Sequence, residues 1–280
     1  MGERGPSIYF RTSLLHYLLN PYSWFWGVVF MSFWAAMSAF VFSKGTPEQY
    51  LLHHFGSTYG QLLILCVGSV AIGIVKSLYY SSFSVRFVTK YSKLSTKRFY
   101  VEHFLSTIIA LMIFALVLWL LQALFYFIKF EEVYLPKNPV GTIFAVVISV
   151  CFIYAFSMFE TYVVICLRRP LSAVFDALPL MLSFIAYAAF WIDFKIYSLA
   201  IPFYLISAIM FYFYTNQKPF TGDIIGNIRY LAQHDSVPKG AELDPILAIA
   251  SMILWTIALS IASIFLIKKA KGVSIEEIQL

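Results

Sequence analysis

Lys76 and Glu160 are ionisable residues within otherwise apolar stretches of the sequence. An ionisable side chain in the hydrocarbon region of a membrane is costly unless it is paired or hydrated. Each residue falls near the end of its stretch, and the two ends are predicted to lie on the same side of the membrane. This placement suits a polar pathway or a proton relay. It also suits a structural ion pair, or a lysine whose ammonium group reaches the membrane surface, and we favour these structural interpretations.

The five histidines do not have the spacing of a metal site. His53 and His54 are adjacent in a predicted loop, and His16, His103 and His234 are scattered along the chain. A structural zinc site usually draws its ligands from short, characteristic sequence spacings. We therefore interpret the histidines as surface or interfacial residues and predict no metal site.

The sequence contains none of the common motifs of nucleotide binding or hydrolysis. It has no G-x-x-x-x-G-K-[S/T] phosphate loop, no G-x-G-x-x-G, no H-E-x-x-H and no G-x-S-x-G. The first two motifs surround phosphates with backbone amides, and the other two place a metal ion or a nucleophile. We expect no enzymatic activity and no cofactor in this chain, and no nucleic-acid partner.

Residues 83–103 form the most basic connection between apolar stretches. The basic residues of this connection are Arg86, Lys90, Lys93, Lys97 and Arg98. Within it, Tyr91–Phe99 mixes positive charge with apolar side chains and is compatible with a short helix capped by Ser95 or Thr96. Such a helix could dock a cytoplasmic protein. The alternative, which composition alone favours, is that the basic residues set the topology and contact anionic lipid headgroups.

Apolar residues dominate the sequence as a whole. Of the 280 residues, 61% are hydrophobic and 12% are charged, and the mean hydropathy is +0.80. This balance is typical of a protein surrounded by membrane rather than water. Stretches of about 20 apolar residues can cross the membrane as helices, and they lack the alternation of barrel strands. The predicted spans are residues 22–42, 60–80, 104–128, 140–167, 171–192 and 245–267.

The distribution of charge predicts the orientation of these spans. Lys and Arg are enriched on the cytoplasmic side of membrane proteins. The basic residues of 83–103, the pair Arg168 and Arg169, and the lysines after the last span all face the cytoplasm if the N-terminus does. We therefore predict that the N- and C-termini are both cytoplasmic. Residues 7–19 mix apolar and polar side chains and predict an amphipathic helix in the membrane surface.

A further apolar stretch, residues 197–214, is short and contains Pro202. If this stretch crossed the membrane, the C-terminal lysines would lie outside. A re-entrant element within 197–244, which enters and leaves on the outer face, keeps them inside. A seven-span arrangement is the alternative. We predict an all-α integral membrane protein in which residues 1–280 form a single transmembrane domain with six spans, an interfacial helix and a re-entrant element before the last span.

The order of these features resembles the type 2 permease family of ATP-binding-cassette (ABC) exporters over nearly the whole chain. In that family an interfacial helix precedes the first span, and a cytoplasmic coupling helix follows the second. The stretch Lys93–Ser106 is similar to the coupling helix and the run into the third span. Late in the chain, Ile201–Phe203 and Lys218–Arg229 resemble the family's proline-initiated outer helix and the turn and short helix after it. The family's usual proline near Leu94 and Ser95 is absent.

The resemblance implies a division of labour between chains. This chain would form the substrate path of an exporter in the plasma membrane, pair with a second permease copy, and depend on a nucleotide-binding ATPase subunit that holds ATP and Mg²⁺. Arg168 and Arg169 would offer a second contact to that subunit. The implied coupling residues are Lys93, Leu94, Ser95, Thr96, Lys97 and Arg98.

Two other functions are compatible with the same sequence. One is a secondary transporter or channel-like protein that uses Lys76 and Glu160 for ion coupling, with the basic connection serving only to set topology. The other is a structural subunit of a larger membrane assembly. An associated ATPase distinguishes the exporter from both.

Overall fold

A computed structural model of the protein describes residues 8–91, 96–167, 175, 177–234, 236, 238 and 240–269, and the side chains of 83–91, 96, 97 and 268 are outside that description. Within this part of the chain the structure is helical and has no β-strand, only two isolated bridges that join Asp193 to Gly222 and Phe220 to Glu242. Five helices are long and apolar enough to cross a membrane. The predicted all-α class is confirmed, and the chain is a multi-pass membrane protein.

The chain begins with two helices that meet at a sharp corner. Helix α1 spans Ile8–Leu19, as predicted for the interfacial helix. It ends just before Pro21, because the residue that precedes a proline disfavours the helical conformation. Asn20 is extended, and its side chain accepts a hydrogen bond from the backbone N–H of Tyr22 at 3.0 Å. This cap starts the first long apolar helix in a new direction.

That first apolar helix, Pro21–Phe42, is continuous but changes its winding twice. Its segments are α2 (Pro21–Trp24), the π-helix η1 (Phe25–Val29), α3 (Phe30–Met37) and the π-helix η2 (Ser38–Phe42). A π-helical turn leaves local backbone groups without their usual partners and is frequent at functional sites. The groups that satisfy η2 come from α5, as described below.

Helices α4 and α5 form a long hairpin at the centre of the molecule. A short 3₁₀ turn, η3 (Glu48–Tyr50), leads into α4 (Leu51–Tyr91), and α5 is Thr96–Phe130. The 41 residues of α4 correspond to about 60 Å of helix, twice the thickness of the hydrocarbon region. Both helices therefore extend well beyond the predicted spans 60–80 and 104–128.

The second half of the chain contains two long helices separated by shorter ones. The long helices are α6 (Pro139–Cys166) and α11 (Pro245–Lys269). Between them lie α8 (Leu178–Tyr187), η4 (Ala188–Phe190), η5 (Lys195–Ala200), α9 (Pro202–Thr215) and α10 (Ile224–His234). The predicted span 171–192 is represented by the apolar helix Leu178–Phe190, and residues 168–174 and 176 lie outside the described residues.

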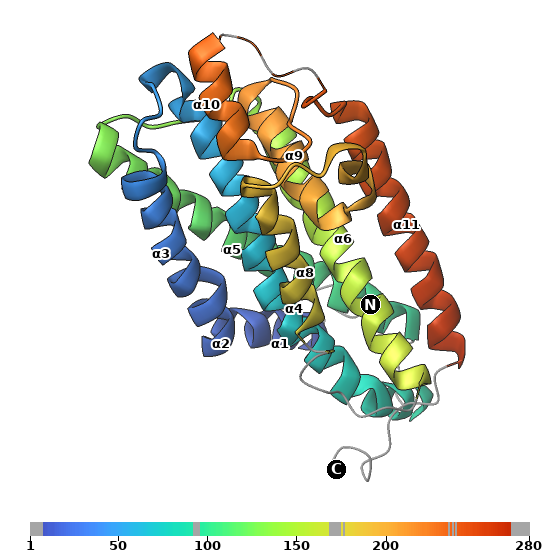
Figure 1. Ribbon diagram of the computed structural model, residues 1–280. Helices are drawn as coiled ribbons and strands as arrows, with labels where there is room; N and C mark the ends of the chain where they lie inside the picture. The colour runs from blue at the N-terminus through green and yellow to red at the C-terminus, as the bar shows by residue number, and fades with distance from the viewer. Residues whose placement is uncertain are drawn as a thin grey trace.

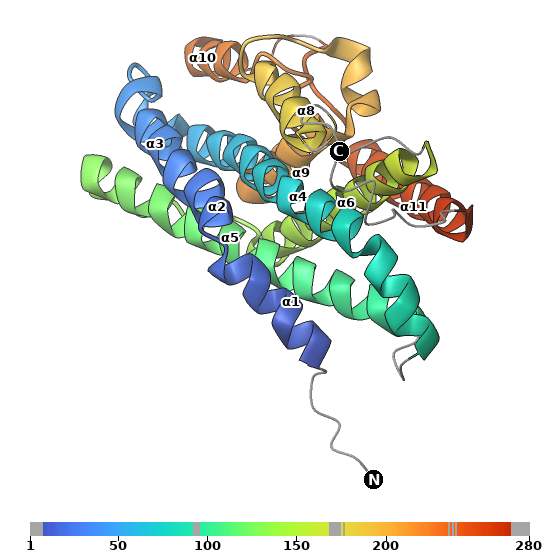
Figure 2. The same ribbon diagram turned by 90° about the horizontal axis from the view of Figure 1, so that it is seen from below.

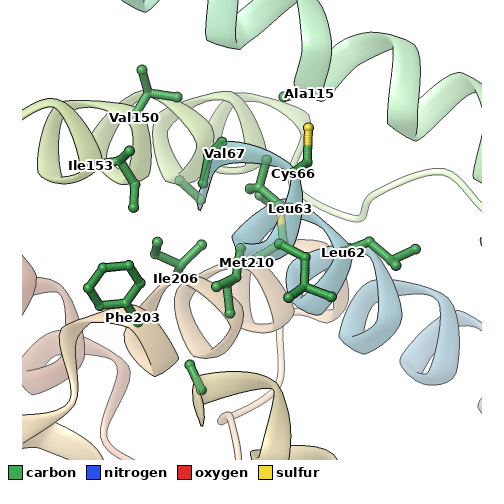
Figure 3. Packing of buried hydrophobic residues seen from close by; sticks show 14 of the residues in the cluster. Leu62, Leu63, Cys66, Val67, Ala115, Val150, Ile153, Phe203, Ile206 and Met210 are labelled. Carbon is green, nitrogen blue, oxygen red and sulfur yellow. The ribbon is translucent and has the colours of Figure 1, made fainter. Parts of the chain in front are cut away.

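Helix α4 is the core of the bundle. Its most apolar window is 83% buried, whereas that of α11 is 17% buried, so α4 is surrounded by protein and α11 lies at the periphery. The views in Figures 1 and 2 agree on this arrangement. Figure 3 shows the packing around α4, where side chains of α4 meet those of α6 and α9. The labelled residues are Leu62, Leu63, Cys66, Val67, Ala115, Val150, Ile153, Phe203, Ile206 and Met210.

Helix α9 approaches α4 so closely that two glycines are needed. A Cβ atom added at Gly60 would lie 2.9 Å from the Cα of Ser207, and one added at Gly56 would lie 3.0 Å from the Cβ of Tyr214. The C-terminal end of α9 also bonds to the segment before α6, since the backbone N–H of Lys137 donates to the carbonyl of Tyr214 at 2.9 Å. These contacts bury nearly every side chain of α9.

The two ends of the bundle differ in construction. One end holds α1, the end of α4, the beginning of α5 and the end of α11; the other holds α10 and the loops beside it (Figure 1). We call these the hairpin end and the α10 end. The sequence predicts that the hairpin end is the cytoplasmic one.

Candidate functional site

The α4–α5 hairpin contains the residues predicted to contact an ATPase subunit. Lys93, Leu94 and Ser95 lie outside the described residues, as do Arg168 and Arg169. Helix α5 begins at Thr96 and continues through Lys97 and Arg98, so these residues belong to a long helix rather than to a separate short one. The Arg98 guanidinium Nε donates to Glu102 Oε1 at 2.7 Å, one turn later on the same helix.

The hairpin projects past the apolar part of its helices. The predicted span 60–80 ends at Tyr80, but α4 continues for eleven more residues to Tyr91, which is about 16 Å of helix. The predicted span 104–128 begins at Phe104, eight residues after α5 begins at Thr96. The end of α4 and the beginning of α5 therefore extend beyond the predicted spans, in a part of the sequence that is basic.

His103 ties the base of this hairpin to two other helices. Its Nε2 lies 3.1 Å from the Tyr17 hydroxyl of α1, and its Nδ1 lies 3.0 Å from the Tyr154 hydroxyl of α6. A neutral imidazole offers one donor and one acceptor, so both bonds can form at once whichever tautomer is present. His103 is 1% exposed. Its interpretation as a surface or interfacial residue was wrong, and so was that of His53 and His54, which are also buried.

Further contacts hold α1 against the hairpin. Ser106 Oγ donates to Ser13 Oγ at 2.9 Å, and the rings of Tyr9 and Phe99 pack with centroids 4.7 Å apart. Burial raises the pKa of the Tyr9 and Tyr17 hydroxyls, so both remain protonated at neutral pH. Figure 2 shows α1 lying across α5. The predicted interfacial helix is thus attached to the beginning of α5.

Lys76 and Glu160 lie in different surroundings. The Lys76 side chain is exposed on α4, whereas Glu160 of α6 is 4% exposed. Exposure of Lys76 suits an ammonium group that reaches the membrane surface. The ion pair between the two residues stays a prediction.

A buried polar cluster near the α10 end joins α4, α5 and the first apolar helix. The Tyr126 hydroxyl lies 2.6 Å from His54 Nδ1 and 2.9 Å from Ser38 Oγ, and Gln122 Nε2 donates to Thr58 Oγ1 at 2.8 Å. Sequence reasoning missed this cluster. Its signal was the spacing of four between His54 and Thr58 and between Gln122 and Tyr126, which places each pair on one helix face.

Lys129 of α5, near the same polar cluster, donates hydrogen bonds to the end of the π-helix η2. Its ammonium group donates to the carbonyl of Ala39 at 2.7 Å and to Ser43 Oγ at 2.8 Å. A cation at the C-terminal end of a helix offsets the partial negative charge of the last carbonyls. Lys129 therefore fixes the end of the first apolar helix to α5.

An outer cavity of about 790 Å³ opens at the α10 end and is lined by several carboxylates. These carboxylates have local structural roles. Asp223 Oδ1 accepts a bond from Gly226 N in α10, Asp244 Oδ1 accepts one from Ile246 N in α11 at 2.8 Å, and Asp193 Oδ1 accepts the Thr221 hydroxyl at 2.7 Å. Among the described residues no group of three or more His, Cys, Asp and Glu could hold a metal ion.

Comparisons with protein-family models, with curated proteins and with solved structures give no match for this chain. Function must therefore be argued from the geometry. The described residues give a long α4–α5 hairpin in which His103 of α5 is hydrogen-bonded to α1 and α6, and the sequence that connects the two helices is basic. This arrangement suits the transmission of movement from a bound protein into the membrane-spanning helices.

Proposed function

We propose that this chain is the permease subunit of a type 2 ABC exporter and that a separate nucleotide-binding subunit supplies ATP hydrolysis. The observation that supports this most is the α4–α5 hairpin, in which α4 continues about 16 Å beyond its predicted span 60–80 and the connecting sequence 83–103 is basic. A hairpin of this length can transmit movement, because a displacement of the connection between α4 and α5 tilts both helices.

The transmembrane arrangement in this proposal has six spans and one re-entrant element. Leu178–Phe190 belongs to the fifth span, and α9 is re-entrant. The Ser251 hydroxyl donates to the carbonyl of Leu199 just before α9, and Ser251 lies six residues, or about 9 Å, below the start of α11. From this depth α9 rises to Thr215 beside the start of α6, so the chain descends from the α10 end and returns to it.

Movement of the hairpin would reach the rest of the bundle through His103. ATP-driven closure of two nucleotide-binding subunits would push the tips of two hairpins, one from each permease copy. Because His103 is hydrogen-bonded to Tyr17 and Tyr154, a tilt of α5 displaces α1 and α6 as well. ATP and Mg²⁺ remain on the partner subunit, and both termini of this chain are cytoplasmic.

A secondary transporter is the second candidate, and burial of Glu160 within an apolar helix favours it. This function requires an ion gradient and no ATPase. Transport that stops when the gradient is collapsed, and that continues without ATP, supports the second candidate against the first.

The test is purification of the full-length, affinity-tagged chain from its native membrane in mild detergent. The exporter predicts that an ATP-hydrolysing subunit with a phosphate loop co-purifies, and that Leu94→Asp, in the sequence that connects α4 and α5, removes it. Leu135→Asp is the matched control, because Leu135 is 60% exposed at the α10 end. Absence of ATPase activity in the wild-type preparation, or equal loss in both variants, contradicts the proposal.

A further inference from the structure

A second cavity lies at the corner where α1 meets the first apolar helix, and we call it the corner cavity. It has a volume of about 600 Å³ and is walled by His16 of α1, by Asn20 and Tyr22 of the corner, and by one face of α4. The residues that α4 contributes include Gly73 and Lys76. Nothing in the proposed exporter function requires this cavity.

The lining of the corner cavity is suited to an anion. Among the described residues, its lining contains a lysine, a histidine, an asparagine amide and several hydroxyl groups, and no aspartate or glutamate. Lysine provides three donors and each hydroxyl provides one, whereas a phosphate group offers only acceptors at neutral pH. The Asn20 Oδ1 atom already accepts the N–H of Tyr22, so its amide nitrogen is left as a donor.

The predicted span 60–80 places the corner cavity near the headgroup layer of a membrane. Lys76 is four residues, or about 6 Å, before the end of this span, a distance that a lysine stem covers when its ammonium group reaches the membrane surface. Two residues that flank the corner in the sequence expose apolar side chains: Leu19 is 73% exposed and Phe25 is 51% exposed. Exposed apolar side chains such as these are more stable in contact with lipid acyl chains than with water.

Gly73 of α4 lines the corner cavity and leaves space beside the helix, which we call the floor of the cavity. A Cβ atom added there meets no other atom within 4 Å, so open space lies beside the helix at this position. A phospholipid requires two features of its binding site. Hydrogen-bond donors in the lining bind its phosphate, and apolar side chains beside the cavity contact its acyl chains.

We propose that the corner cavity binds the phosphate headgroup of an anionic phospholipid at the hairpin end of the bundle. The lipid contacts α1, the corner and α4 together and so holds the interfacial helix in place. Inorganic phosphate has the same recognition chemistry, but it lacks the acyl chains that the apolar surround would bind.

The test is native mass spectrometry of the full-length protein with phosphatidylglycerol or phosphatidylcholine of identical acyl chains. A lysine near an anionic membrane surface strengthens binding by about fivefold. We expect a preference for phosphatidylglycerol that falls by about this factor in Lys76→Gln and is lost in Gly73→Leu, which fills the floor. Lys44→Gln removes an exposed lysine at the α10 end and should keep the preference.

Several results would overturn the proposal. Equal binding of the two lipids by the wild type does so, as does an unchanged preference in both Lys76→Gln and Gly73→Leu. Displacement of phosphatidylglycerol by an equal concentration of inorganic phosphate identifies free phosphate as the ligand and overturns the choice of lipid; retention of the lipid supports it. Wild-type melting temperature in either variant excludes misfolding as the cause of a lost preference.

Discussion

The close contact between α4 and α9 predicts that alanine is not tolerated at Gly60. A Cβ atom there would lie 2.9 Å from the Cα and 3.1 Å from the carbonyl oxygen of Ser207. Favourable contacts between such atoms occur at about 3.5–4.0 Å. The opposing atoms belong to the backbone, so a change of rotamer cannot relieve the clash and α9 must move away. Overpacking of this kind costs about 1–3 kcal/mol.

Gly73→Ala is the matched control, because Gly73 is in the same helix and a Cβ atom there meets nothing within 4 Å. Glycine is about 0.8–1.0 kcal/mol less favourable than alanine inside a helix, so this variant should be slightly more stable. Thermal unfolding in detergent, followed by circular dichroism, measures both changes. A loss of about 2 kcal/mol lowers the Tm by about 4–8 °C. A Gly60→Ala protein as stable as the wild type refutes the packing of α9 on α4.

Three further substitutions test other buried contacts. His103→Leu removes the bonds that hold α1 and α6 to α5. We expect the free energy of unfolding to fall by about 1–3 kcal/mol and tryptic cleavage after Arg11 to become faster. Unchanged cleavage contradicts the attachment of α1. Lys129→Met frees the end of η2 and should lower the Tm by several degrees, whereas Lys44→Met should not; equal effects refute the specific role of Lys129. Tyr214→Phe leaves the donor of Trp119 without its partner and should cost about 1 kcal/mol in thermal unfolding, and a neutral effect contradicts that bond.

The positions of the long helices follow from the sequence, but their lengths do not. Apolar windows identify the residues that need hydrocarbon around them, and the five long apolar helices overlap predicted spans. A helix continues through polar residues wherever protein packs against them. His53 and His54 were therefore assigned to a loop, although α4 begins at Leu51 and buries both.

The polar contacts between helices were not predictable from the sequence because they depend on how each helix is rotated. Hydropathy treats Gln122 and Tyr126 as small interruptions of an apolar stretch. Their role is visible only when α4 and the first apolar helix are placed beside α5, where Tyr126 meets His54 and Ser38. His103 was overlooked as a contact for the same reason.

The sequence predicted some features of the region of the coupling residues and missed others. The basic sequence of 83–103 and its place between two spans indicated an exposed connection, and the helices on either side of it do extend beyond the predicted spans 60–80 and 104–128. The sequence indicated a short helix capped by Ser95 or Thr96, but it did not show that this helix would continue without a break as α5, because the polar run before His103 resembles a loop in hydropathy. The contact with an ATPase subunit stays a prediction.

Crosslinking from the sequence that connects α4 and α5 tests the central claim most directly. A cysteine introduced by Leu94→Cys is labelled with a photoactivatable maleimide in native membranes, irradiated, and the products are probed with a photoreactive ATP analogue. Leu135→Cys at the α10 end is the control. The exporter predicts a crosslinked product from Leu94→Cys alone that also binds the ATP analogue. Products without ATP binding, or the same products from both positions, contradict the claim that this hairpin receives the movement of an ATPase.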